Sequence, residues 1–177
     1  MTVAPDFQLV KPQILPPLDK DFRPAVLANR NFLQNVADSN DCSRLVIGLE
    51  RSDGYIAHFK SKVFSEDHVH AKSNLMYVER IIKFLLWQKG GWKIYLGGPR
   101  SIGEYIQSCY SADGARRFDF HFMQRDVYEK PFTVVICEPD EVPLMMESSQ
   151  PLGRHLDGCR IGFDLGASDR KSSAVID

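Results

Sequence analysis

The sequence lacks the features that assign a chain to a membrane, secreted or nucleic-acid-binding class. No apolar run approaches the roughly 18–20 residues needed to span a bilayer, and the first residues show no basic-then-apolar signal pattern. The formal net charge is only −1, which gives no overall attraction to nucleic acid or to an anionic membrane. We therefore expect a cytoplasmic protein without a membrane partner. The low net charge also disfavours nucleic acid as a partner.

Paired cysteines are missing as well. The four cysteines stand far apart without a C-x-x-C pair, so the spacing supports neither a zinc site nor a disulfide framework. We expect free thiols. What is present is 177 residues, of which 44% are hydrophobic and 25% charged. This composition is typical of an ordinary globular protein with room for one domain plus extensions.

Proline dominates the beginning of the chain, which we assign as residues 1–42. Five of the ten prolines lie before residue 25, and they predict an extended arm whose apolar side chains lie along another surface. A loosely ordered tail is the alternative. Pro24 suits the first turn of a helix over 25–37.

Residues 43–138 have the periodicity of a mixed α/β domain. The pattern predicts a β-hairpin, a helix, a strand, a helix and two more strands, over residues 45–49 and 55–64, 68–88, 92–96, 102–110, 118–123 and 132–137. An Asp-Gly turn joins the first two strands, and residues 65–67 offer an N-cap for the first of these helices. We expect the last strand to be the more fully buried one. One mixed sheet covered by helices fits this order, so the fold class is α/β or α+β.

Residues 139–158 contain three prolines and no sustained period. They predict a linker between the sheet domain and a terminal element.

The terminal element, residues 159–177, predicts a β-hairpin. Ile161, Phe163 and Leu165 alternate with polar residues or glycine, and Asp164 stands where the strand runs out. A turn of small residues follows, and a second apolar run begins at 174. We expect this hairpin to be truncated in its second strand, and that strand to fray or to pair with an edge of another copy.

This arrangement suits phosphate binding. Small residues at Gly166, Ala167 and Ser168 let backbone N–H groups approach phosphate oxygens closely. Asp164 is then placed to organise a Mg²⁺, commonly through water. Arg170 and Lys171 add positive charge after the turn.

Residues 161–168 resemble the first phosphate-binding loop of the sugar kinase/Hsp70/actin superfamily, and within it the ROK family of sugar kinases and repressors. The ROK loop reads roughly Asp-x-Gly-Gly-Thr-Lys, whereas this chain has Ala-Ser for Gly-Thr and Asp169 in place of the Lys. The resemblance implies ATP and Mg²⁺ as cofactors of a larger parent protein. It also implies a C-terminal kinase-like domain as partner, since the other catalytic parts would follow this loop.

We therefore expect the chain to be the non-catalytic N-terminal accessory or interaction region of a larger ROK-like sugar kinase or regulator. Phosphoryl transfer needs several parts acting together, so this chain alone should bind no cofactor productively. Self-association is a second expected interaction.

Two alternatives stay open. One is the turn formed by Gly97, Gly98, Pro99, Arg100 and Ser101, which leads from a strand into a helix and could bind an anion in a small enzyme. The same turn could instead be purely structural. The other is a DNA-binding regulator, because residues 70–125 carry nine basic and four acidic side chains.

Overall fold

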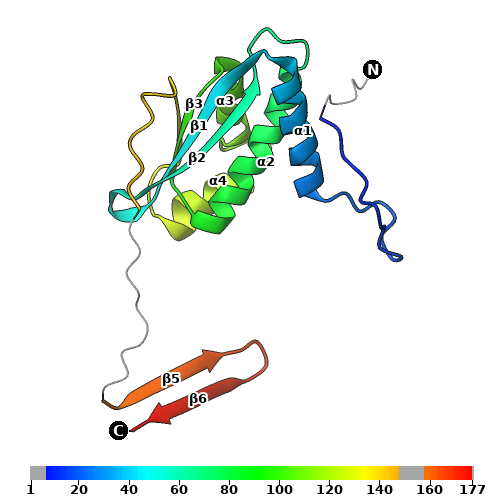
Figure 1. Ribbon diagram of the computed structural model, residues 1–177. Helices are drawn as coiled ribbons and strands as arrows, with labels where there is room; N and C mark the ends of the chain where they lie inside the picture. The colour runs from blue at the N-terminus through cyan, green and yellow to red at the C-terminus, as the bar shows by residue number, and fades with distance from the viewer. Residues whose placement is uncertain (1–6, 148–157, 177) are drawn as a thin grey trace. The chain divides into compact units, whose positions relative to one another are not determined.

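The structure, a computed structural model, describes residues 7–147 and 158–176 (Figure 1). The chain divides into two compact units between Glu147 and Ser148. The described residues form four α-helices and a four-stranded mixed sheet in the first unit, and a two-stranded sheet in the second. The predicted mixed class is confirmed, in its α+β form. None of the helices in these residues combines the length and the apolar character that a bilayer crossing requires.

The first unit follows much of the predicted order. Its elements are α1 (Ala25–Ser39), β1 (Cys42–Glu50), the short 3₁₀ helix η1 (Ser52–Gly54), β2 (Ile56–Phe64), α2 (Ala71–Lys89), β3 (Lys93–Gly97), α3 (Arg100–Cys109), α4 (Arg117–His121), the π-helix η2 (Phe122–Val127) and β4 (Thr133–Cys137). Pro24 occupies the N-cap of α1, and Asn40 ends the helix in the left-handed conformation with φ 55°. Gly90, at φ 77°, ends α2.

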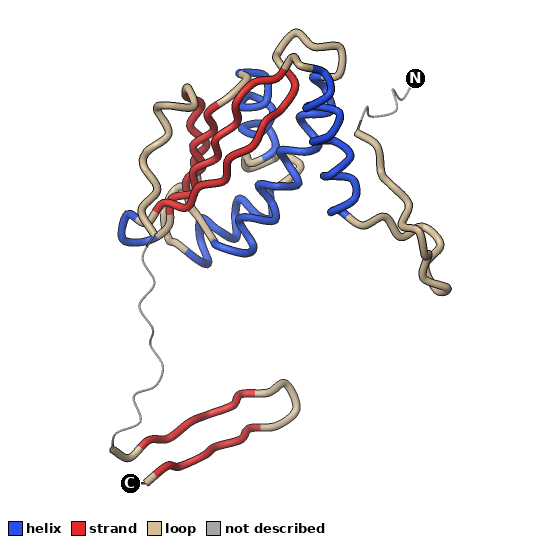
Figure 2. The backbone as a smooth tube through the Cα atoms, in the orientation of Figure 1, coloured by secondary structure: helices blue, strands red, loops and turns tan. Residues whose placement is uncertain are grey.

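The sheet has the strand order β2-β1-β3-β4. β1 is antiparallel to both β2 and β3, and β3 is parallel to β4. Figure 2 shows the helices gathered on one side of this sheet. β4 forms one edge and is half-buried, so the expectation of a more fully buried last strand is wrong.

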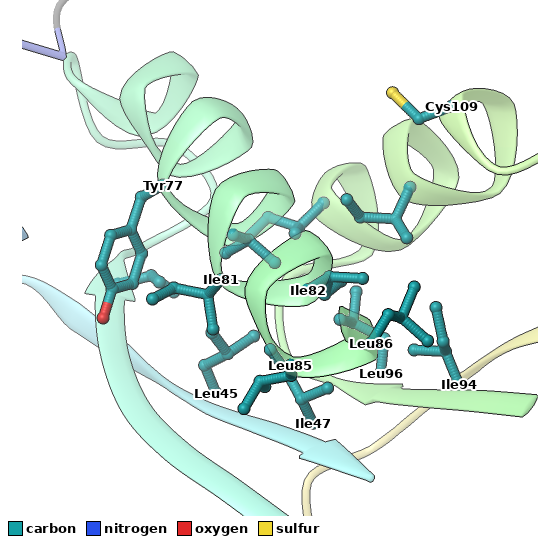
Figure 3. Packing of buried hydrophobic residues seen from close by; sticks show 14 of the residues in the cluster. Leu45, Ile47, Tyr77, Ile81, Ile82, Leu85, Leu86, Ile94, Leu96 and Cys109 are labelled. Carbon is teal, nitrogen blue, oxygen red and sulfur yellow. The ribbon is translucent and has the colours of Figure 1, made fainter. Parts of the chain in front are cut away.

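The core lies between that helical layer and the sheet. Alternate residues of the central strands point toward the helices, among them Leu45 and Ile47 of β1 and Ile94 of β3, all fully buried. Ile82 and Leu86, four apart on α2, meet them from the other side (Figure 3). The 3.6-residue period of α2 therefore placed its buried face correctly.

Residues 138–147, here called the covering segment, cross part of the second face of the sheet. Val142, 6% exposed, lies over two glycines of neighbouring strands, Gly48 and Gly97. Met146 forms an antiparallel bridge with Ile56, with N···O distances of 2.9 and 3.0 Å. The predicted linker is therefore wrong for residues 139–147, because this apolar residue and this strand pairing attach them to the sheet. Residues 148–157 lie outside the described residues.

Ion pairs fasten the covering segment. The guanidinium of Arg44 lies 2.9 Å from the Asp140 carboxylate. The Glu147 carboxylate accepts from both Arg51, at 3.1 Å, and Lys89, at 3.0 Å. The exposed Arg44–Asp140 pair adds little stability, whereas the two pairs of Glu147 are half-buried and fix the end of the segment.

The stretch 118–123 is helical, which corrects the predicted strand. Asp119 and Met123 are four residues apart, so a helix brings both side chains to the same face, and both are buried. The Asp119 carboxylate accepts a hydrogen bond of 2.6 Å from the indole N–H of Trp87 on α2. Six residues of alternation are too few to distinguish the two structures, and this tertiary contact favours the helix.

The start of α2 also differs from the prediction. The helix begins at Ala71 instead of 68, with His70 at the N-cap and without a side-chain capping bond. Ser65, Glu66 and Asp67 therefore do not cap it. Glu66 instead accepts a hydrogen bond of 3.1 Å from the backbone N–H of Ser101, at the start of α3.

The arm docks through Phe7. This ring is 3% exposed, lies 5.8 Å from the ring of Phe32 on α1, and is covered by the guanidinium of Arg80 at 5.2 Å. Leu9, Ile14 and Leu15 are exposed. The predicted docked arm thus holds at Phe7 and not at these three residues; residues 1–6 lie outside the described part of the chain.

The second unit is a hairpin of β5 (Arg160–Leu165) and β6 (Arg170–Val175). The strands pair residue for residue, from Arg160 opposite Val175 to Leu165 opposite Arg170. The second strand thus begins at Arg170, earlier than the predicted 174. Within the described hairpin every side chain from Ile161 to Ile176 is exposed.

Candidate functional site

The phosphate-binding residues expected from sequence all lie at one end of the hairpin. Asp164 is the penultimate residue of β5 and stands directly opposite Lys171 of β6. Gly166, Ala167 and Ser168 lie in the turn that joins the strands. The hairpin therefore brings the acid, the small residues and the following cation together, as the sequence pattern requires.

Asp169 occupies part of this turn. A Cβ placed on Gly166 would lie 2.9 Å from an Asp169 carboxylate oxygen and 3.1 Å from its backbone oxygen. The other carboxylate oxygen lies 3.5 Å from the Lys171 ammonium. The small residues and Asp164 fit a magnesium–phosphate group, whereas Asp169 does not, because its charge repels phosphate and it holds the nearest cation.

The candidate anion turn has internal partners. Ser101, at the start of α3, donates its N–H to Glu66, and Arg100 pairs with Glu104 at 2.8 Å. A Cβ on Gly97 would lie 2.6 Å from the Cα of Pro139 in the covering segment. Glycine at Gly97 is thus explained by close backbone packing, and one carboxylate of the protein already lies at this helix N-terminus.

The helices do not form a helix-turn-helix. β3 separates α2 from α3 and pairs with β1 and β4 inside the sheet. A recognition helix joined to its neighbour by a short turn is the geometry that DNA-binding motifs of this type need. The arrangement of these elements therefore gives the DNA-binding alternative no support.

A buried polar cluster between α2, α3 and α4 was not foreseen. Glu79 of α2 accepts a short hydrogen bond from Arg116, and the two side chains are only 11% and 29% exposed. This hydrogen bond raises the pKa of Arg116. The signal was present in the sequence, because Glu79 interrupts the apolar stripe of α2 beside Val78 and Ile82.

The ionisable groups beside that cluster are not activated for catalysis. Burial raises the pKa of the Cys109 thiol, the pKa of Tyr105 to about 12 and, further still, the pKa of Tyr110. All three remain protonated at neutral pH, whereas a nucleophile or base needs a pKa near or below the working pH. All four cysteines of the chain are free, as predicted.

A hollow of about 750 Å³ lies beside the arm. Phe7, Phe32 and Phe64 line it together with His68 and His70. The rings of Phe64 and His68 stack at 4.5 Å, and His68 Nδ1 accepts from the His70 backbone N–H at 3.1 Å. The described residues hold no group of three or more His, Cys, Asp or Glu side chains placed for a metal ion, so two imidazoles here do not make a metal site.

Comparisons with models of protein families, with curated proteins and with solved structures find no match to this chain. The ROK resemblance of the hairpin consequently depends on its own residues and geometry.

Proposed function

We propose that residues 160–175 are the first phosphate-binding hairpin of a ROK-like sugar kinase or regulator, and that the first unit is its non-catalytic accessory region. The observation that carries this proposal is the position of Asp164 near the end of β5, directly before a turn of small residues and opposite Lys171. A generic hairpin has no need of a carboxylate and small residues in this order.

In this proposal Asp164 positions a Mg²⁺ through water, and the N–H groups of Gly166, Ala167 and Ser168 approach phosphate oxygens. Arg170 and Lys171 supply the positive charge after the turn. ATP and Mg²⁺ are the cofactors of the parent protein, and a kinase-like domain following the hairpin is its partner. Metal and nucleotide contribute the transferable phosphoryl group and its charge neutralisation.

The chain by itself should not transfer phosphate. One loop lacks the catalytic base and the second set of phosphate contacts that the reaction requires. We expect the purified 177-residue chain to consume ATP at the background rate with any of a panel of hexoses. Sugar-dependent ATP consumption above background, abolished by Asp164→Asn, would show that the chain is catalytic and overturn this part of the proposal.

Replacing Asp169 by lysine should strengthen phosphate binding about tenfold. The change removes a repelling carboxylate from the turn and adds a cation, and exposed charge interactions contribute up to about 1 kcal/mol each. Titration with Mg-ATP, followed through the NMR amide shifts of Gly166, Ala167 and Ser168, measures the affinity.

Asp113→Lys is the matched control, because it makes the same charge change at an exposed residue of the first unit. It should leave the turn amides unaffected. Equal strengthening by both variants would mean non-specific attraction of the nucleotide. An Asp169→Lys chain whose turn amides do not respond to Mg-ATP would argue against a phosphate site in the hairpin.

A further inference from the structure

The hairpin has two outer edges, and in the described part of the chain neither is paired with another strand. A two-stranded hairpin is marginally stable in water on its own. One face of this hairpin carries Ile161, Phe163 and Leu165, which are 67%, 73% and 76% exposed. Both the unpaired edges and the apolar face favour association with another strand.

The sequence of β5 is complementary to itself when it is read around Gly162. Arg160 and Asp164 stand at equal distances on either side of this glycine, and so do Ile161 and Phe163. In an antiparallel pair of identical strands centred on one residue, positions at equal distances lie directly opposite each other. We propose that β5 pairs antiparallel with β5 of a second copy of this chain, centred on Gly162.

This register satisfies charge and apolar contacts together. Arg160 of each copy lies opposite Asp164 of the other, and opposite charges at facing positions stabilise a sheet. On the opposite face of the sheet, Ile161 of each copy lies opposite Phe163 of the other, so the apolar side chains of the two copies pack together. Asp164 also stands opposite Lys171 within its own hairpin, where the Lys171 ammonium pairs with Asp169 at 3.5 Å.

The pairing converts two hairpins into one four-stranded sheet. Three or more strands with an apolar face are the usual requirement for independent stability. The apolar face doubles in extent, because each copy contributes Ile161, Phe163 and Leu165 to the same side.

The other edge is unsuited to the same contact. β6 begins with Arg170 and Lys171 and contains no acidic residue, so pairing β6 with itself along its length places these cations opposite Val175 and Ala174, with no opposite charge to face them. Cations on an edge strand are a common protection against unwanted pairing. The charges therefore select β5 as the associating edge.

This inference goes beyond the proposed phosphate function and does not depend on it. The contact shares Asp164 with the proposed metal site, but the strand pairing itself requires neither metal nor phosphate. Nucleotide titration tests the phosphate site and sedimentation tests the pairing, so either result can fail without the other.

Analytical ultracentrifugation of the full chain over a concentration series tests the proposal. We expect the native chain to dimerise reversibly. Asp164→Arg places arginine opposite arginine, and Arg160→Asp places aspartate opposite aspartate, so each variant alone should dimerise at least tenfold more weakly. A native chain that stays monomeric throughout, or single variants that dimerise as well as the native chain, would overturn the pairing.

An equimolar mixture of the two variants provides the decisive measurement. In the mixed dimer, both facing pairs again have opposite charges, so association should return to within about threefold of the native value. Variants that had merely loosened their own hairpins would stay apart in the mixture, and that result would also overturn the proposed register. Asp169→Lys, which changes the turn and not the edge, should leave dimerisation unchanged.

Discussion

Replacing Arg116 by methionine is expected to lower the free energy of unfolding of the first unit by about 3 kcal/mol. Methionine keeps much of the length of the arginine side chain but removes the partner of Glu79, whose carboxylate is buried between the helices. A buried carboxylate without a partner costs far more than the loss of an exposed ion pair. Both tryptophans of the chain lie in the first unit, so denaturant unfolding followed by tryptophan fluorescence reports on this unit alone.

Arg117→Met is the matched control, because this neighbouring arginine is exposed. It should change stability by less than about 0.5 kcal/mol. Replacing Glu79 and Arg116 together by methionine should recover more than half of the loss, since no charge is then left without a partner. Equal effects of Arg116→Met and Arg117→Met would show that the buried pair contributes nothing particular.

Replacing Gly97 by alanine should destabilise the first unit by about 2–3 kcal/mol. The new methyl group would lie 2.6 Å from the Cα of Pro139 and 2.9 Å from a methyl of Val142. Because Pro139 presents backbone, which cannot rotate away, the covering segment must move off the sheet. Unfolding measurements and limited proteolysis within residues 138–147 detect the loss of stability and the displacement.

Gly48→Ala gives an internal comparison. Its nearest obstacle is a methyl of Val142, again at 2.9 Å, and the next contacts belong to Tyr95 at 3.4 Å or more. Val142→Ala should therefore rescue Gly48→Ala but not Gly97→Ala. Equal rescue of both variants would mean that the backbone of Pro139 is not what restricts Gly97.

The sequence predicted the elements that have a long, clear period. The apolar face of α2 and the strands that it covers were expected correctly, because burial of one helix face repeats over five turns. The stretch 118–123 was wrong because alternation over six residues fits a helix equally well. The hydrogen bond from Trp87 to Asp119, which favours the helix, joins residues 32 positions apart.

The covering segment was missed for a related reason. Its sequence, which includes Pro139 and Pro143, has no period, and among its residues only Val142 is buried against the sheet. Its position depends on the absence of side chains at Gly48 and Gly97, on strands far away in the sequence. No local pattern reports such a contact.

The hairpin shows how far the candidate site itself could be predicted. The strand, the acid and the turn were placed correctly, since each depends on neighbouring residues. The position of the Asp169 carboxylate next to Gly166 was not predicted. Where a side chain lies in a turn depends on the three-dimensional path of the backbone.

The covering segment has a kinetic consequence. Its contacts join residues separated by 96 positions, Arg44 with Asp140 and Arg51 with Glu147, or by 85, His58 with Pro143. Closing such long loops costs entropy, and Val142 is the only buried residue of the segment, so we expect these contacts to form late and to open before the core. The amides of Ile56 and Met146 should therefore exchange with solvent through a partial opening that leaves the helical face intact, while amides in the middle of β1 exchange only when the whole unit unfolds.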